Sequence, residues 1–324
     1  MRAGSRRVAY GAVPPVTEPL TKAGHAVGRQ KLAGHLAMLL FAALVSGSYS
    51  LGAIAAPHVG PAAINAVRFM IGIAVMGTAA ALILGGRIPA PRAAWRYLVL
   101  GALMAAFMVT MFVALRLTDP VSTGAVFTLL PLMAAGFGWL FLGEVPRPAV
   151  MASLVVAALG AIWVIFRGDI DALLSFDIGT GELIFFVGVA CHAAYAPLVK
   201  RFNRGEPVVA FTFWTLVATG AWITLYGAPE IAATDWSSVS LTVWLVIAYL
   251  AIFTTAGTFF LLQFAAMRLP AAKVLAYNYL TPSFVILYEG LLGHGWISFA
   301  VLAGAALTAA ALLVLAFSGD ATSR

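Results

Sequence analysis

The sequence predicts an all-α polytopic membrane protein whose ten transmembrane helices form a 5+5 inverted repeat. Three observations support this: the composition, the number of long apolar stretches and a weak internal repeat. Of the 324 residues, 62% are hydrophobic and 10% are charged. A soluble domain has about 25% charged residues, so a soluble enzyme and a disordered chain are excluded. The single cysteine, Cys191, excludes an internal disulfide and a cysteine-rich metal site.

Ten stretches of the chain are apolar and long enough to cross a bilayer, which takes about 20 residues. They are 33–56, 61–84, 94–115, 121–142, 147–166, 181–199, 208–228, 239–262, 271–292 and 296–317. The loops between them are short, and the longest, 167–180, leaves no room for a folded domain outside the membrane. The alternating pattern of an outer-membrane barrel is absent.

The spans divide the chain into two five-helix repeats with short tails. Residues 1–31 are basic, lack apolar periodicity and are predicted to be a disordered cytoplasmic tail. The repeats occupy 32–167 and 168–318, and 319–324 form a cytoplasmic C-terminal tail. With the N-terminus inside, 16 of the 19 lysines and arginines fall on the cytoplasmic side. The positive-inside rule therefore predicts that both termini are cytoplasmic, and the net charge of +7 does not indicate nucleic-acid binding.

An internal repeat is visible in the order and spacing of a few residues. A shift of 151 superposes Pro131 on Pro282, and a shift of 146 superposes Tyr49 on Tyr195 and Pro61 on Pro207. Because five is an odd number, the second half enters the membrane from the opposite side, which gives an inverted repeat typical of secondary transporters. The alternative is a ten-helix bundle in which the two prolines match by chance.

Two runs of residues resemble a known family. The run from Ala114 through Pro131 to Phe141-Leu142-Gly143-Glu144 resembles the fourth span of EamA-type proteins of the drug/metabolite transporter superfamily. The run from Pro61 to Arg68-Phe69 resembles the second span, and the other half of the chain follows the pattern more loosely, with His294 in place of the glutamate.

The resemblance implies an inner-membrane secondary transporter, commonly an exporter of amino acids or other small metabolites. It also implies a central cavity lined by spans 1, 3, 4, 6, 8 and 9. Spans 5 and 10 would lie at the periphery, where they could join two copies as a homodimer.

Arg68 and Glu289 are the charged residues that lie clearly inside spans. An arginine inside the membrane costs free energy, so Arg68 is expected to face a cavity or a partner and to pair with a substrate carboxylate. The alternatives are a structural pair and snorkelling towards the headgroups. Glu289 lies at a similar depth and is a candidate proton carrier and a candidate partner of Arg68, or else an interfacial residue in contact with water.

Polar aromatic residues gather near the middle of three spans and form the rest of the predicted substrate site. The predicted substrate-binding residues are Tyr49, Asn65, Arg68, His192, Tyr195, Tyr277 and Asn278. Such residues suit a cavity that holds an organic molecule by stacking and a few hydrogen bonds. His192 is also a candidate for proton coupling, and Asn65 is expected to orient Arg68. The alternative role for each is hydrogen bonding between helices.

Pro131 and Pro282 are predicted to kink spans 4 and 9 and to serve as hinges, because proline lacks the backbone donor. Gly101 and Gly160 predict close helix contacts, and Glu144 with nearby Arg147 predicts an ion pair that either stabilises the helix end or acts as a gate. The chain has no ATP-binding loop, zinc motif or nucleophile elbow, so no cofactor or metal is expected.

The sequence therefore predicts a transporter of a small organic molecule in the lipid bilayer, without nucleic acid as a partner. An integral-membrane enzyme acting on lipid and a non-transporting membrane subunit are the alternatives. The enzyme would need a nucleophile and a base at the same depth in the membrane. A subunit that forms a channel would need a continuous stripe of polar residues.

Overall fold

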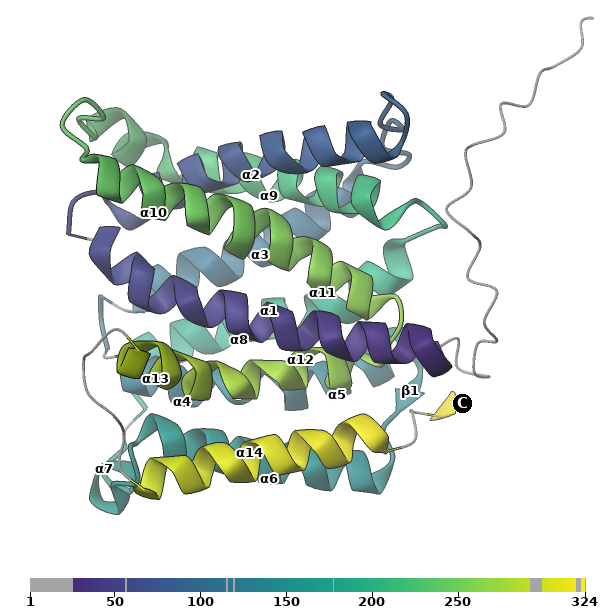
Figure 1. Ribbon diagram of the computed structural model, residues 1–324, viewed down its shortest axis with the longest axis vertical. Helices are drawn as coiled ribbons and strands as arrows, with labels where there is room; N and C mark the ends of the chain where they lie inside the picture. Colours follow the sequence, from purple (N-terminus) through teal and green to yellow (C-terminus); the bar gives the residue numbers. More distant parts are fainter. Residues whose placement is uncertain are drawn as a thin grey trace, which may run out of the picture.

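The protein is a bundle of long helices joined by short loops, seen in a computed structural model (Figure 1). The structure describes residues 26–55, 57–114, 116–118, 120–176, 178–291, 299–318 and 322–323, and it leaves the side chains of Tyr49 and Glu289 undescribed. Its first half contains α1 (Gly28–Ala55), α2 (Pro61–Ile83), α3 (Trp95–Ala114), α4 (Pro120–Phe127), α5 (Leu130–Leu142), β1 (Glu144–Val145) and α6 (Pro148–Ile165).

The second half repeats this order after the short helix α7 (Ile170–Leu174). It contains α8 (Thr180–Phe202), α9 (Val208–Ala233), α10 (Leu241–Ala251), the π-helix η1 (Ile252–Gly257), α11 (Thr258–Ala266), α12 (Ala271–Ala276), the 3-10 helix η2 (Tyr277–Leu280), α13 (Thr281–Leu291), α14 (Phe299–Phe317) and β2 (Thr322–Ser323). The first helix begins four residues inside the predicted tail, at Gly28, and Ala26 already donates a backbone hydrogen bond to Arg268.

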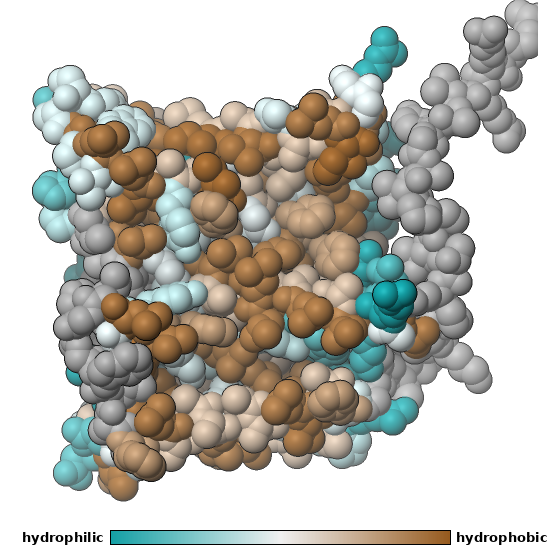
Figure 2. Space-filling model, viewed as in Figure 1, coloured by the Kyte–Doolittle hydropathy of each residue, from teal (hydrophilic) through white to brown (hydrophobic). Residues whose placement is uncertain are grey.

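Eight helical segments of the described residues are long and apolar enough to cross a membrane. A shorter apolar helix covers Val301–Phe317, whereas the predicted span 271–292 is divided into α12, η2 and α13. Large apolar side chains such as Leu225, Leu241 and Leu313 are between 60% and 73% exposed on the outside of the bundle. Hydrophobic residues cover the middle of the face seen in Figure 2, and hydrophilic ones lie towards both ends of the helices. This surface suits a lipid environment and confirms a multi-pass membrane protein.

The two ends of the bundle can be distinguished by the termini of the chain. Helix α1 begins and α14 ends at the same end, on the right in Figure 1, and α7 lies at the other. We call the first of these the N-terminal face; it includes the loops 84–94, 143–147, 203–207 and 267–270. At this face β1 pairs antiparallel with β2, with Glu144 opposite Ser323.

Equivalent spans of the two halves pack against each other. Helix α2 packs on α9, α6 packs on α14, and α5 of the fourth span packs on α12 of the ninth. At two of these crossings the residues in contact are 151 positions apart, the shift found in the sequence. Tyr279 donates a hydrogen bond to the carbonyl of Thr128, at 2.8 Å, and Thr308 approaches the carbonyl of Ala157, at 3.5 Å. Each such residue therefore meets its own counterpart from the other half of the chain.

Both prolines predicted to kink a span lie directly after a break in it. Helix α4 ends at Phe127, and α5 begins at Leu130 with Pro131 as its second residue. In the second half, η2 separates α12 from α13, in which Pro282 is again the second residue. A proline at this position loses no intrahelical hydrogen bond, so the breaks fall where its missing donor costs least. The role of these breaks as hinges stays a prediction.

Candidate functional site

Arg68 contacts a distorted segment of the helix opposite. Its Nε donates a hydrogen bond of 3.0 Å to Thr255 Oγ1 in η1. Thr255 is fully buried and in turn donates to the carbonyl of Leu250, five residues earlier, which matches the wider turn of a π-helix. Among the described side chains, Arg68 has no carboxylate partner. The guanidinium is thus held at one nitrogen by a neutral group, and its charge is available to an anion.

Of the residues predicted to surround Arg68, Asn65 has another partner, and the side chains of Tyr49 and Glu289 are not described. Asn65 donates to the carbonyl of Pro61 on its own helix, at 2.7 Å, so the expectation that it orients Arg68 is not met. A short amide side chain can donate to the helical carbonyl four residues before it, and this local bond replaces a contact across to Arg68. The side chains of Tyr49 and Glu289 are not described, so the proposed pair of Arg68 with Glu289 stays untested.

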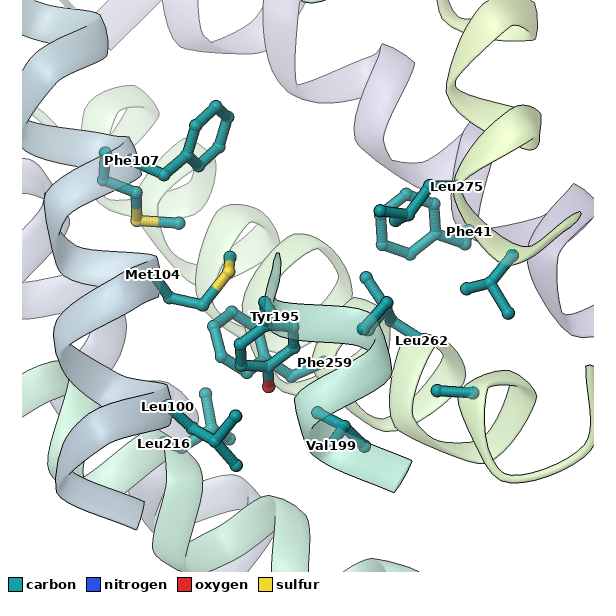
Figure 3. Packing of buried hydrophobic residues seen from close by; sticks show 14 of the residues in the cluster. Phe41, Leu100, Met104, Phe107, Tyr195, Val199, Leu216, Phe259, Leu262 and Leu275 are labelled. Carbon is teal, nitrogen blue, oxygen red and sulfur yellow. The ribbon is translucent and has the colours of Figure 1, made fainter. Parts of the chain in front are cut away.

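Tyr195 belongs to a buried polar chain that links three helices. Gln263 of α11 donates to the Tyr195 hydroxyl at 2.7 Å and accepts a hydrogen bond from Thr212 of α9, also at 2.7 Å. Tyr195 is 1% exposed, and Gln263 and Thr212 are fully buried. Figure 3 shows the Tyr195 ring beside Phe259, within a cluster that includes Met104 and Phe107 of α3. These hydrogen bonds join α8, α9 and α11 at the centre of the bundle.

Tyr277 and Asn278 lie in η2, and their bonds point to a partly structural role. The Tyr277 hydroxyl lies 2.9 Å from Nδ1 of His35 in α1, which joins the first span to the break in the ninth. Asn278 donates to the carbonyl of Leu275, three residues earlier, at 2.9 Å, and so stabilises the tight turn itself. Both side chains are buried by protein, at 7% and 4% exposure.

His192 differs from the other predicted site residues because neither of its ring nitrogens has a hydrogen-bond partner among the described residues. It is 4% exposed, and its ring centroid lies 4.5 Å from that of Phe107 and 6.2 Å from that of Phe127. Buried polar atoms are almost always paired, so an imidazole without partners at mid-span needs an explanation.

The N-terminal face is closed by an ion pair and by backbone contacts. Lys200 of α8 donates to Glu144 at 3.1 Å, and the backbone N–H of Ala271, which begins α12, donates to the other carboxylate oxygen at 3.2 Å. The expected partner of Glu144 was Arg147; its ion-pair partner is Lys200, because the left-handed turn at Gly143 brings Glu144 back towards α8. Glu144 therefore ties together the fourth, sixth and ninth spans.

A second ion pair at this face joins α3 to the loop after α8. Arg96 is buried and bonds to Glu206 at 2.6 Å. Partial burial alone would raise the pKa of Glu206, but hydrogen bonds from Arg96 and from the backbone of Arg204 bring it below its ordinary value.

Sequence reasoning missed several residues that complete these contacts: Thr255, Gln263, His35 and Lys200. Gln263 carried a usable signal, since a lone glutamine within an apolar helix has to find a partner in the bundle. Thr255 and Lys200 carried none, because threonines and helix-end lysines are common in membrane helices. Only the packing shows which of them face the interior.

Comparisons with known proteins agree with this architecture. The model of the EamA-like transporter family matches residues 32–166 and 179–317. The Uncharacterized transporter YyaM of Bacillus subtilis (strain 168) is 27% identical over 185 residues, which are 56% of this chain and 61% of that protein. A solved crystal structure superposes with a TM-score of 0.73 at 23% identity, covering 88% of this chain and 95% of the other, and shows a shared fold.

Proposed function

The chain belongs to the EamA-like transporter family, and on this premise we propose that it is a secondary transporter that moves a small organic solute by alternating access. In this proposal the chain crosses an inner membrane ten times, as two five-span repeats of opposite orientation, with both termini in the cytoplasm. Export is the direction that the family resemblance favours.

Contacts between counterpart residues support the inverted arrangement. Tyr279 with Thr128 and Thr308 with Ala157 meet where equivalent helices cross. Gly138 of α5 lies against Ala271 of α12. This contact comes later in the fourth span and earlier in the ninth span than the contact of Thr128 with Tyr279. The two helices therefore run antiparallel, as expected for repeats related by an axis in the membrane plane.

The assignment of a solute site rests on the environment of Arg68. A part-buried arginine without a carboxylate partner among the described side chains is costly within a membrane span and is generally functional. Its contact is a π-helix, a distortion that is frequent at functional sites. We assign to Arg68 the recognition of a solute carboxylate, with Thr255 fixing the guanidinium for this contact.

The ion pair at the N-terminal face supports alternating access. Glu144, Lys200 and the start of α12 close this end of the spans that contain both breaks. Movement at Pro131 or Pro282 would separate these groups, so the ion pair acts as a gate that opens when the solute site turns towards the cytoplasm. Proton coupling through Glu289 or His192 is compatible with this scheme.

A transport assay in vesicles tests the proposal. The purified chain is reconstituted and assayed against a panel of carboxylate and non-carboxylate metabolites, with and without a pH gradient. We expect flux of at least one carboxylate solute and at least a tenfold loss on Arg68→Gln. Arg116→Gln, which changes an exposed arginine in a loop, is the matched control and should retain flux. Absence of flux for every solute, or an Arg68→Gln variant as active as the wild type, would refute the assignment.

A further inference from the structure

Four aromatic rings from three helices form a cluster at the middle of the bundle, which we call the aromatic box: Phe107 of α3, Phe127 of α4, and Phe185 and His192 of α8. The rings of Phe107 and Phe127 stack at 5.9 Å, and those of Phe127 and Phe185 at 6.3 Å. His192 lies against Phe107 at 4.5 Å. The box therefore presents flat apolar faces next to one polar ring.

The polar ring is the unusual member of the box. An imidazole always has at least one N–H donor, and here neither nitrogen of His192 is paired among the described residues. No other described member of the box carries a polar side-chain atom. Burial of such a group costs free energy unless another molecule supplies its hydrogen bonds in part of the functional cycle.

The residue at the corresponding position of the first half has hydrogen-bond partners. A shift of 146 places Ser46 of α1 at the position of His192. The Ser46 hydroxyl bonds to the carbonyl of Ala42 at 2.6 Å and lies 3.2 Å from that of Thr281 in the ninth span. The unpaired imidazole is therefore a feature of the second half alone and does not follow from the shared helix packing.

One wall of the box lies at the break in the fourth span. Phe127 is the last residue of α4, immediately before the turn that leads to Pro131. Because the two rings of Phe107 and Phe127 come from different helices, a change of angle at this break would separate them and expose His192 between flat aromatic faces.

We propose that the aromatic box is the part of the solute site that selects for a planar unsaturated ring with a polar group at its edge. The ring stacks against Phe107, Phe127 and Phe185, and its polar edge exchanges a hydrogen bond with His192. This inference rests on the proposed transport function and adds to it the class of solute.

Three probes of similar size separate the two parts of this recognition. All three probes carry a carboxylate and differ in the ring. The ring of 4-hydroxyphenylacetate is planar with a hydroxyl at its far edge, and the ring of phenylacetate is planar without that hydroxyl. The ring of cyclohexylacetate is neither planar nor polar at its far edge. Binding to the purified full-length chain is measured by isothermal titration, and uptake into vesicles by competition. We expect affinity to fall in the order given, by about tenfold for loss of the hydroxyl, since a hydrogen-bonding site rejects an analogue without the group.

His192→Phe keeps a flat aromatic ring, of slightly larger size, and removes both nitrogens. This variant should bind 4-hydroxyphenylacetate no better than phenylacetate, while Phe107→Leu should weaken both planar probes. Phe317→Leu, which changes an exposed ring at the end of α14, is the control and should bind all three probes as the wild type does.

Stability provides a second readout that does not depend on the probe. Removing unpaired nitrogens should raise the Tm of His192→Phe by about 2–4 °C without ligand. A lower Tm would mean that the imidazole is satisfied within the protein, and would overturn the proposal. Unchanged discrimination in His192→Phe, or no binding of planar probes by a wild type that transports another solute, would also overturn it and leave the transport function standing. A wild type that transports nothing would count against the proposed function itself.

Discussion

The hydroxyl of Tyr279 donates a hydrogen bond of 2.8 Å to the backbone carbonyl of Thr128, the residue 151 positions before it. Thr128 lies in the turn that interrupts the fourth span, and Tyr279 in the 3-10 segment that interrupts the ninth. The bond thus links the two breaks directly, and it satisfies a carbonyl that the interrupted helix leaves without its usual partner. We therefore expect a change of angle at one break to affect the other.

Tyr279→Phe removes this hydrogen bond and keeps the ring. We expect the free energy of unfolding to fall by about 0.6–1.5 kcal/mol, because interhelical hydrogen bonds in membranes contribute this much. Thermal unfolding in a mild detergent measures the change. Tyr226→Phe, at a tyrosine that is 50% exposed, should leave the Tm unchanged; equal effects in the two variants would argue against a link between the breaks.

Gly101→Ala tests the close approach of α3 to α9. A Cβ at Gly101 would lie 2.7 Å from the backbone of Ala218 and Thr219, so the helices must separate. Such overpacking costs about 1–3 kcal/mol. Gly136→Ala is the matched control, because nothing lies within 4 Å of its Cβ position, and it should stabilise by up to about 1 kcal/mol. The yield of folded protein and the Tm distinguish the two, and a tolerated Gly101→Ala would contradict this packing.

Glu206→Gln tests the pH dependence at the N-terminal face. The pKa of Glu206 is lowered in the folded protein, mainly by Arg96 and the Arg204 backbone acting against partial burial. Its contribution to stability is therefore present above the unfolded-state pKa and is lost as the pH falls through the lowered folded-state pKa.

The Tm of the wild type should thus fall more steeply than that of Glu206→Gln when the pH is reduced from about 7 to about 3. Asp171→Asn, at an exposed aspartate in α7, should keep the wild-type slope. Parallel curves for the wild type and Glu206→Gln would show that Glu206 does not contribute to the acid sensitivity.

Glu144→Gln and Lys200→Met test the gate at the N-terminal face. Each removes the ion pair that joins the fourth and sixth spans at 3.1 Å, so this end should open more often. A cysteine introduced by Ala272→Cys, in a background where Cys191 is changed to Ser, reports the opening through its reaction with a maleimide. We expect the labelling rate to rise at least threefold in both variants. Arg87→Gln, which changes an exposed arginine in the loop 84–94 of the same face, should not change it.

The helical segments, their order and the repeat could be predicted from the chain itself. Long apolar runs have one stable solution in lipid, because every backbone group must bond within its own helix. The breaks before Pro131 and Pro282 also follow from local chemistry, since proline lacks a donor wherever it stands. The start of α1 at Gly28 did not follow, because a polar first turn carries no apolar signal.

The partners of the site residues could not be predicted, because they depend on rotations and depths that the packing fixes. Arg68 was expected to need a partner, but only the fold shows that the partner among the described residues is Thr255, 187 positions away in a π-helix. The same holds for Tyr195 with Gln263 and for Glu144 with Lys200. Apolar periodicity determined which segments form helices in the membrane. The tertiary structure decided which polar side chains meet and which, like His192, do not, since a hydrogen bond needs two groups within about 3 Å and spacing along one chain cannot specify that.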